Sequence, residues 1–200
     1  MSRAFTPRPY QRYAIKRIVN TPAVALLLDM GMGKTVSTLT AIDELMYDRF
    51  AVQKVLVIAP LRVALSTWRD ECEMWEHTRH LRISVAVGDL RTREAALAED
   101  ADIYVVNRDV VKWLVGDYQA KWPFDMVVID ESSSFKNPAS QRFRALRKVR
   151  PLIRRIVLLT GTPAPNGLMD LWSQLYLLDR GERLGRTLTE YRERYFRPGQ

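Results

Sequence analysis

The segment Asp-Met-Gly-Met-Gly-Lys-Thr at residues 29–35 has the residue types and spacing that bind a nucleotide phosphate. Its glycines let the backbone bend around a phosphate with N–H groups pointing inward, and a helix that begins just after it adds positive potential. At this spacing Lys34 reaches the β- and γ-phosphates, and the hydroxyl of Thr35 can hold Mg²⁺. The general phosphate-loop (P-loop) pattern has a glycine where Leu28 stands, so the match is to a variant. The expected nucleotide contacts are Asp29, Gly31, Met32, Gly33, Lys34 and Thr35.

Two adjacent carboxylates, Asp130 and Glu131, end an apolar run at 126–129. One carboxylate at a strand end can hold a Mg²⁺ that bridges phosphates, and its neighbour can orient or deprotonate an attacking water. We expect Asp130 to bind the metal and Glu131 to activate the water. An acidic pair at a strand end is common, and the P-loop elsewhere in the chain is what favours the catalytic interpretation. The expected catalytic residues are Lys34, Asp130 and Glu131.

A third segment places Thr160, Gly161 and Thr162 directly after an apolar run at 156–159. Small hydroxyl side chains at that point could sense the phosphate end of the site and pass its state to another surface. The alternative is a strand that runs into an ordinary Gly/Pro turn.

Short apolar runs and helix-period segments alternate along the chain. The runs are rich in Val, Ile and Leu, as expected for strands buried on both faces of a parallel sheet. Between them, apolar residues recur at helical spacing, for example Leu65–Trp68–Cys72 and Leu168–Leu171–Leu175. The alternation predicts an α/β domain with a mostly parallel, doubly wound sheet flanked by helices and with sites at the carboxyl ends of its strands. The runs lie at 23–28, 55–59, 83–87, 103–106, 126–129 and 156–159.

Composition excludes several classes of protein. The 200 residues are 47% hydrophobic and 27% charged, as in globular chains, which excludes wholesale disorder. The longest apolar stretches are about a third of the roughly 20 residues that a bilayer span needs, and no signal-peptide pattern opens the chain, so we expect no membrane association. One cysteine cannot form an internal disulfide, which favours the cytoplasm. The net charge of +8 favours polyanionic partners.

Taken in order, these segments resemble motifs I, II and III of the superfamily-two helicases, and most closely the Swi/Snf-type ATPases that translocate on double-stranded DNA. Motif I of that group reads Asp-x-Gly-x-Gly-Lys-Thr, as at residues 29–35. Arg-Pro-Tyr-Gln at 8–11 resembles the adenine-recognising Q-type motif. Residues 59–61, followed by Trp68, resemble motif Ia, and 105–108 resemble motif Ib. The resemblance covers about residues 5–178.

The resemblance implies a RecA-like P-loop NTPase lobe that uses ATP and Mg²⁺. It places the adenine near Tyr10 and Gln11, and the metal on Thr35 and Asp130. It also implies contacts to double-stranded DNA from the loops after the strands, which would position the duplex without reading its bases. The candidate DNA-binding residues are Pro60, Arg62, Asn107, Arg108 and Thr162.

The chain departs from the family pattern at two places. Ser132-Ser133 stand where the group usually has Ala-His or Ala-Gln, which shortens the side chain that links motif II to motif III. The Asp-Glu-Ser-Ser form is similar to that of compact phage-encoded members, which implies a host-cytoplasm location. Nothing after Asn166 resembles motifs IV to VI, and 200 residues cannot hold a second RecA-like lobe.

We therefore expect the ATP-binding N-terminal lobe of a Swi/Snf-like helicase or DNA translocase, either a fragment or half of a split system. It would hydrolyse ATP when paired with a second lobe and be nearly inactive alone. Residues 1–178 would form the lobe, and 179–200 a charged connector with a helix over 187–195. Two alternatives remain open: a non-catalytic nucleotide- or DNA-binding module, and a P-loop enzyme of another class, which would need a lid and an acceptor site.

The run from Arg142 to Arg155 carries seven basic residues with no acid between them. Three interpretations are open for it: a solvated basic helix followed by a loop, a surface that contacts phosphate backbone, and a docking face for an acidic partner.

Overall fold

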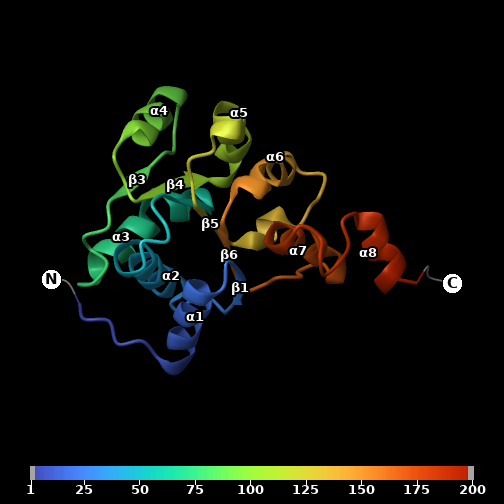
Figure 1. The fold of residues 1–200 in the computed structure, drawn as a ribbon, viewed down its shortest axis with the longest axis horizontal. Helices are drawn as coiled ribbons and strands as arrows, with labels where there is room; N and C mark the ends of the chain where they lie inside the picture. The colour runs from blue at the N-terminus through green and yellow to red at the C-terminus, as the bar shows by residue number, and fades with distance from the viewer. Residues whose placement is uncertain (1–2, 198–200) are drawn as a thin grey trace.

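The computed structural model describes residues 3–197, which fold around a six-stranded sheet with the strand order β1-β6-β5-β2-β4-β3 (Figure 1). Every pairing between these strands is parallel, which confirms the α/β, doubly wound class. The strands are β1 (Ala23–Leu27), β2 (Val55–Ala59), β3 (Ile83–Val85), β4 (Ile103–Asn107), β5 (Met126–Asp130) and β6 (Arg155–Thr160).

Helices cover both faces of the sheet. Successive strand residues point to opposite faces, so the continuous apolar runs supply two cores. Leu56 and Ile58 belong to one core and Val55 and Val57 to the other. The second core packs against α1 (Pro9–Asn20), α2 (Lys34–Asp43) and α3 (Trp68–Met74). The first core packs against α4 (Leu90–Ala98), α5 (Val111–Tyr118), α6 (Gln141–Val149), α7 (Leu171–Asp179) and α8 (Leu188–Tyr195).

Two residues of the expected helical stripes are exposed instead of buried. Leu65 lies in a π turn (Val63–Thr67), which takes more residues per turn than an α-helix, so Ala64 faces the core four positions before Trp68. Leu168 lies in a 3₁₀ turn (Leu168–Asp170) that precedes α7, and its side chain is 62% exposed. The stripe prediction was wrong at these two positions because it assumed α-helical spacing throughout.

The segment after α7 packs back onto the sheet's helical layer. The predicted helix over 187–195 is present as α8, and Thr187 caps it by accepting a hydrogen bond from the backbone N–H of Glu190. Tyr191 is buried in the first core and donates a hydrogen bond to the carbonyl of Leu168. The indole of Trp172 donates to the carbonyl of Gly185 at 3.1 Å.

The basic run from Arg142 to Arg155 is not uniformly solvated. Arg150 is buried and donates to the carbonyls of Leu177 and Leu178 at the end of α7. Arg155 donates to the carbonyls of Ile18 and Val19 at the end of α1, both at 2.7 Å. Cations at the last carbonyls of a helix satisfy acceptors that have no intrahelical partner. These two arginines therefore hold helix ends, and the interpretation of the whole run as a solvated helix or a single contact surface was wrong for them.

No helix within residues 3–197 is long and apolar enough to cross a membrane.

Candidate nucleotide-binding site

The predicted P-loop connects β1 to α2. Gly31 and Gly33 have φ values of +77° and +72°, in the left-handed region that favours glycine, and α2 begins at Lys34. A Cβ added to Gly33 would lie 2.3 Å from the side-chain nitrogen of Gln11, whereas one on Gly31 would meet no atom within 4 Å. The loop is therefore packed against α1 at Gly33 and open at Gly31.

The ammonium of Lys34 is held by the loop itself. Its Nζ donates to the carbonyl of Leu28 at 2.7 Å and to that of Asp29 at 3.0 Å. These two residues join the end of β1 to the loop, so the charge lies at the carboxyl end of that strand. Thr35 follows in the first turn of α2 and is partly exposed.

A pocket of about 480 Å³ lies between the N-terminal segment, α1 and the P-loop. Gln11 is positioned at its base: its Oε1 accepts from the backbone N–H of Arg8 at 2.8 Å, and its Nε2 donates to the carbonyl of Met32 at 3.4 Å. Pro at the first position of α1 presets the backbone angle that starts this helix. The pocket is lined by Ala4, Phe5, Thr6, Arg8, Tyr10, Gln11, Gly31, Gly33, Val36, Glu71 and Trp75. Tyr10 and Gln11 thus line the same pocket as Gly31 and Gly33 of the P-loop.

Asp130 ends β5 and is partly buried. Its Oδ2 accepts a hydrogen bond from the indole of Trp68 at 3.0 Å, which fixes the carboxylate at the carboxyl edge of the sheet. Burial raises the pKa of the Asp130 carboxyl above its usual range, and the Trp68 hydrogen bond acts in the opposite direction. The neighbouring charge of Glu131 also raises this pKa, and Lys34 lowers it.

Glu131 has a backbone conformation that is rare for its residue type. Its φ of +54° lies in the left-handed region, which costs a non-glycine residue about 1–2 kcal/mol. The side-chain Oε1 accepts from the hydroxyl of Thr160 at 2.7 Å and from that of Ser133 at 3.0 Å. The left-handed turn thus directs the carboxylate from the end of β5 toward the end of the adjacent strand β6.

Thr160 and Gly161 form the contact between the acid pair and the P-loop. The backbone N–H of Leu28 donates to the carbonyl of Thr160 at 3.1 Å, and a Cβ on Gly161 would lie 3.3 Å from the carbonyl oxygen of Leu28. The hydroxyl of Thr160 also accepts from the backbone N–H of Thr162 at 3.1 Å. Of the three residues predicted to couple the site to another surface, Thr160 and Gly161 therefore bridge Glu131 and the start of the P-loop, and Thr162 contacts Thr160.

A buried glutamine links Ser132 to the segment that follows Thr162. The hydroxyl of Ser132 donates to Oε1 of Gln174 at 2.8 Å, and Nε2 of Gln174 donates to the carbonyl of Pro163 at 2.6 Å. Ser132 follows the acid pair and Pro163 follows Thr162. The longer side chain thus comes from α7, and the short serine beside the acid pair reaches motif III through it.

The five candidate DNA-binding residues lie at the carboxyl edge of the sheet: Asn107 is the last residue of β4, and the other four follow β2, β4 or β6. They differ in accessibility. Arg62 and Thr162 are exposed and Pro60 and Arg108 partly exposed, whereas Asn107 is buried at 8% and donates to a carboxylate oxygen of Asp109 at 3.5 Å.

Sequence reasoning missed the roles of Trp68 and Gln174. Trp68 was expected in the core, and it is fully buried, but its N–H also contacts Asp130 across 62 residues of chain. Gln174 interrupts the apolar pattern of α7 and is only 3% exposed. A polar residue on the buried face of a predicted helix was the available signal for Gln174.

The donor set at this edge fits ATP and Mg²⁺. The open space above Gly31 leaves room for a phosphate, and Lys34 and the first N–H groups of α2 supply positive charge next to it. The carboxylate of Asp130 and the hydroxyl of Thr35 are oxygen ligands, which Mg²⁺ prefers.

The sequence model of the SNF2-related domain matches residues 11–198. The chain belongs to the SNF2-related family. This confirms the Swi/Snf-type resemblance, and the six parallel strands are the fold expected of a lobe of such an ATPase.

Solved and curated relatives of this chain extend well beyond it. The SWI2/SNF2 ATPase core of Sulfolobus solfataricus in complex with dsDNA superposes with a TM-score of 0.78 at 30% identity, over 94% of this chain and 38% of its own. Protein p41 of Acyrthosiphon pisum secondary endosymbiont phage 1 is 42% identical over 99% of this chain and 45% of its own length. The ISWI chromatin-remodeling complex ATPase ISW1 of Saccharomyces cerevisiae is 29% identical over 86% of this chain and 15% of its own. The chain spans less than half the length of each.

Proposed function

We propose that this chain is the ATP-binding N-terminal lobe of a Swi/Snf-like translocase on double-stranded DNA, and that it hydrolyses ATP when a second RecA-like lobe closes on it. One observation carries the proposal. The P-loop after β1 and the acid pair at the end of β5 flank the Thr160 end of β6, one strand on either side. With strands about 4.8 Å apart, this leaves the acid pair within reach of the phosphate end of a nucleotide on the P-loop.

Each site residue has a role in the proposal. Tyr10 and Gln11 bind the adenine, Lys34 binds the β- and γ-phosphates, and Thr35 with Asp130 holds Mg²⁺. Bound Mg²⁺ would neutralise phosphate charge. Glu131 accepts the proton of the attacking water, and its hydrogen bond from Thr160 orients the carboxylate that does so.

Replacing Lys34→Ala is expected to lower the affinity for ATP with Mg²⁺ about 100-fold. The ammonium makes charge-assisted hydrogen bonds to phosphate, each worth roughly 1.5–3 kcal/mol, and alanine removes them. The affinity can be measured by titration calorimetry. Lys16→Ala, an exposed lysine of α1, is the matched control and should bind as the parent does. Equal affinity in the Lys34 variant would contradict the P-loop assignment.

We propose that double-stranded DNA binds this lobe, which the similarity to the Sulfolobus ATPase core solved with dsDNA supports, and that the duplex lies across the carboxyl edge. The exposed Arg62 and Thr162 and the partly exposed Arg108 are the contacts that the geometry favours. Asn107 is buried, so its part is to hold the turn after β4 through Asp109.

DNA binding by this lobe is expected to depend on salt and not on base sequence. Two phosphate contacts, from Arg62 and Arg108, predict a slope of log affinity against log salt near −1.8, which is roughly a tenfold loss for a fourfold rise in salt. Arg62→Ala should reduce the slope by about 0.9, and Lys16→Ala should leave it unchanged. Fluorescence anisotropy with a labelled duplex measures both. A flat affinity over that range would exclude phosphate contacts at this edge.

The division into a lobe at 1–178 and a connector at 179–200 stays part of the proposal. The packing of Tyr191 on the first core supports a connector that leaves the lobe from a fixed direction. A non-catalytic nucleotide-binding module remains the second candidate, and the rate measurements described in the Discussion separate the two.

A further inference from the structure

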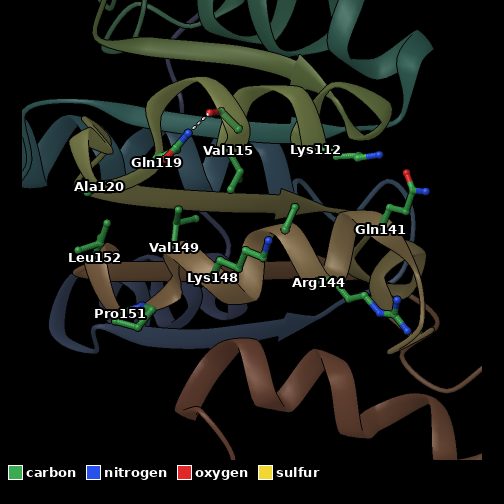
Figure 2. Close-up of a pocket in the computed structure, with 12 residues that line it drawn as sticks. Lys112, Val115, Gln119, Ala120, Gln141, Arg144, Lys148, Val149, Pro151 and Leu152 are labelled. Carbon is green, nitrogen blue, oxygen red and sulfur yellow. Dashed lines mark hydrogen bonds between the residues drawn. The ribbon is translucent and has the colours of Figure 1, made fainter.

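A groove of about 800 Å³ lies between α5 and α6, on the helical layer over the first core (Figure 2). Figure 2 shows Val115 and Val149 pointing into it from opposite sides, with Lys112 and Gln141 at one end and Ala120 and Leu152 at the other. The groove lies along the two helices, whereas the nucleotide pocket lies beside α1 on the other face of the sheet. No residue of the proposed ATP site lines it.

The groove exists because the facing positions of the two helices are small or short. On α5 the lining positions 112, 115 and 116 lie at helical spacing and include Gly116. A Cβ added to Gly116 would meet no atom within 4 Å. Ala145 and Val149 lie opposite on α6, and Leu152 beyond its end is 46% exposed. A glycine inside a helix lowers the stability by roughly 0.5–1 kcal/mol relative to alanine. Gly116 therefore keeps the apolar floor of the groove open while making α5 less stable.

The rim of the groove carries one sign of charge. The charged residues that line the groove are Lys112, Arg144 and Lys148. Within the part of the chain that the structure describes, no Asp or Glu lines it. Other basic residues of α6 have partners: Arg142 lies 3.8 Å from a carboxylate oxygen of Asp109, and Arg147 stacks on Tyr176. Within residues 3–197 the three rim cations make no ion pair at 4 Å or less.

We propose that this groove docks an acidic, amphipathic helix of a partner protein. An apolar floor is buried favourably by aliphatic side chains spaced at i, i+3/i+4 and i+7, and the cationic rim pairs with the carboxylates that flank them. A phosphate backbone would leave the floor uncovered, because it offers no apolar group to fill it. The sequence left three interpretations open for the basic run at 142–155. The cationic rim and the apolar floor together favour one of them, a docking face for an acidic partner. The groove uses Arg144 and Lys148 of that run.

The probe is a fluorescein-labelled peptide of about 14 residues, or about four helical turns, with Leu at i, i+3, i+4 and i+7 and Glu elsewhere. Its binding to the 200-residue chain is followed by anisotropy. A peptide of the same composition with scrambled Leu positions and a Gln-for-Glu peptide are the ligand controls. The designed peptide should bind at least about tenfold more tightly than either, because each control lacks one of the two complementary features. Equal binding of all three would overturn the proposal.

Two variants locate the peptide. Gly116→Leu places its Cβ in open space, so it should fill the groove and weaken peptide binding about tenfold, while leaving the melting temperature equal or higher. The double variant Arg144→Glu with Lys148→Glu should weaken peptide binding similarly. The control is the double variant Lys16→Glu with Arg194→Glu on α1 and α8. It changes the net charge by the same amount and should leave peptide binding unchanged. Unchanged peptide affinity in Gly116→Leu would overturn the proposal. Loss of duplex DNA affinity in the rim variant with peptide binding intact would show instead that the groove contacts DNA.

Discussion

Adding a second RecA-like lobe to this chain, fused or in trans, is expected to raise its DNA-dependent ATP hydrolysis by about 10³ to 10⁵. Hydrolysis needs positive charge on the γ-phosphate in the transition state, and an arginine supplied from the opposite side of the nucleotide provides it. Three of the arginines that follow the acid pair in this lobe are engaged elsewhere. Arg150 and Arg155 hold helix ends, and Arg183 lies 3.3 Å from Asp179.

The measurement is steady-state phosphate release with and without duplex DNA, for the chain alone and with the second lobe. The chain alone should hydrolyse ATP barely above background and respond little to DNA. The Lys34→Ala variant in the two-lobed protein is the control for contaminating ATPases. Robust DNA-stimulated hydrolysis by the verified monomer would contradict the prediction. Either the two-lobe proposal would then be wrong, or an arginine of this chain such as Arg180 would act on the γ-phosphate. If neither form hydrolyses ATP, the non-catalytic alternative holds.

Replacing Glu131→Gln in the two-lobed protein is expected to lower turnover by about 10² to 10⁴ while ATP binding is retained. Glutamine keeps the size of the side chain and can still accept the hydrogen bond from Thr160, but it cannot take a proton from water. Single-turnover hydrolysis and nucleotide titration separate the two effects.

Two controls make the Glu131 experiment specific. Ser133→Ala removes the second hydrogen bond to the same carboxylate oxygen but keeps the base, so it should cost far less. Glu76→Gln removes an exposed charge outside the site and should change nothing. An unchanged turnover rate in the Glu131 variant would place the general base elsewhere.

The local features of this protein were determined by its sequence. Each apolar run became a strand within two residues of its predicted ends, because a continuous apolar run is buried favourably in a parallel sheet that helices cover on both faces. Parallel strands place all their carboxyl ends at one edge, so the alternation of strands and helices in the sequence already placed the P-loop, the acid pair and Thr160 along that edge. The glycines at 31 and 33 were predicted to let the backbone bend, and both adopt left-handed conformations in the loop.

Only the tertiary structure decided which distant side chains meet at that edge. Trp68 contacts Asp130, 62 residues further along the chain. Gln174 contacts Ser132 across 42 residues, and Gln11 packs against Gly33 across 22. The periodicity of apolar residues predicts which face of a helix or strand a residue lies on. It does not predict which distant side chain the residue contacts, because that depends on strand order and helix packing. For the same reason the basic run could not be resolved in advance. Packing turned Arg150 and Arg155 toward helix ends and left Arg144 and Lys148 beside the groove.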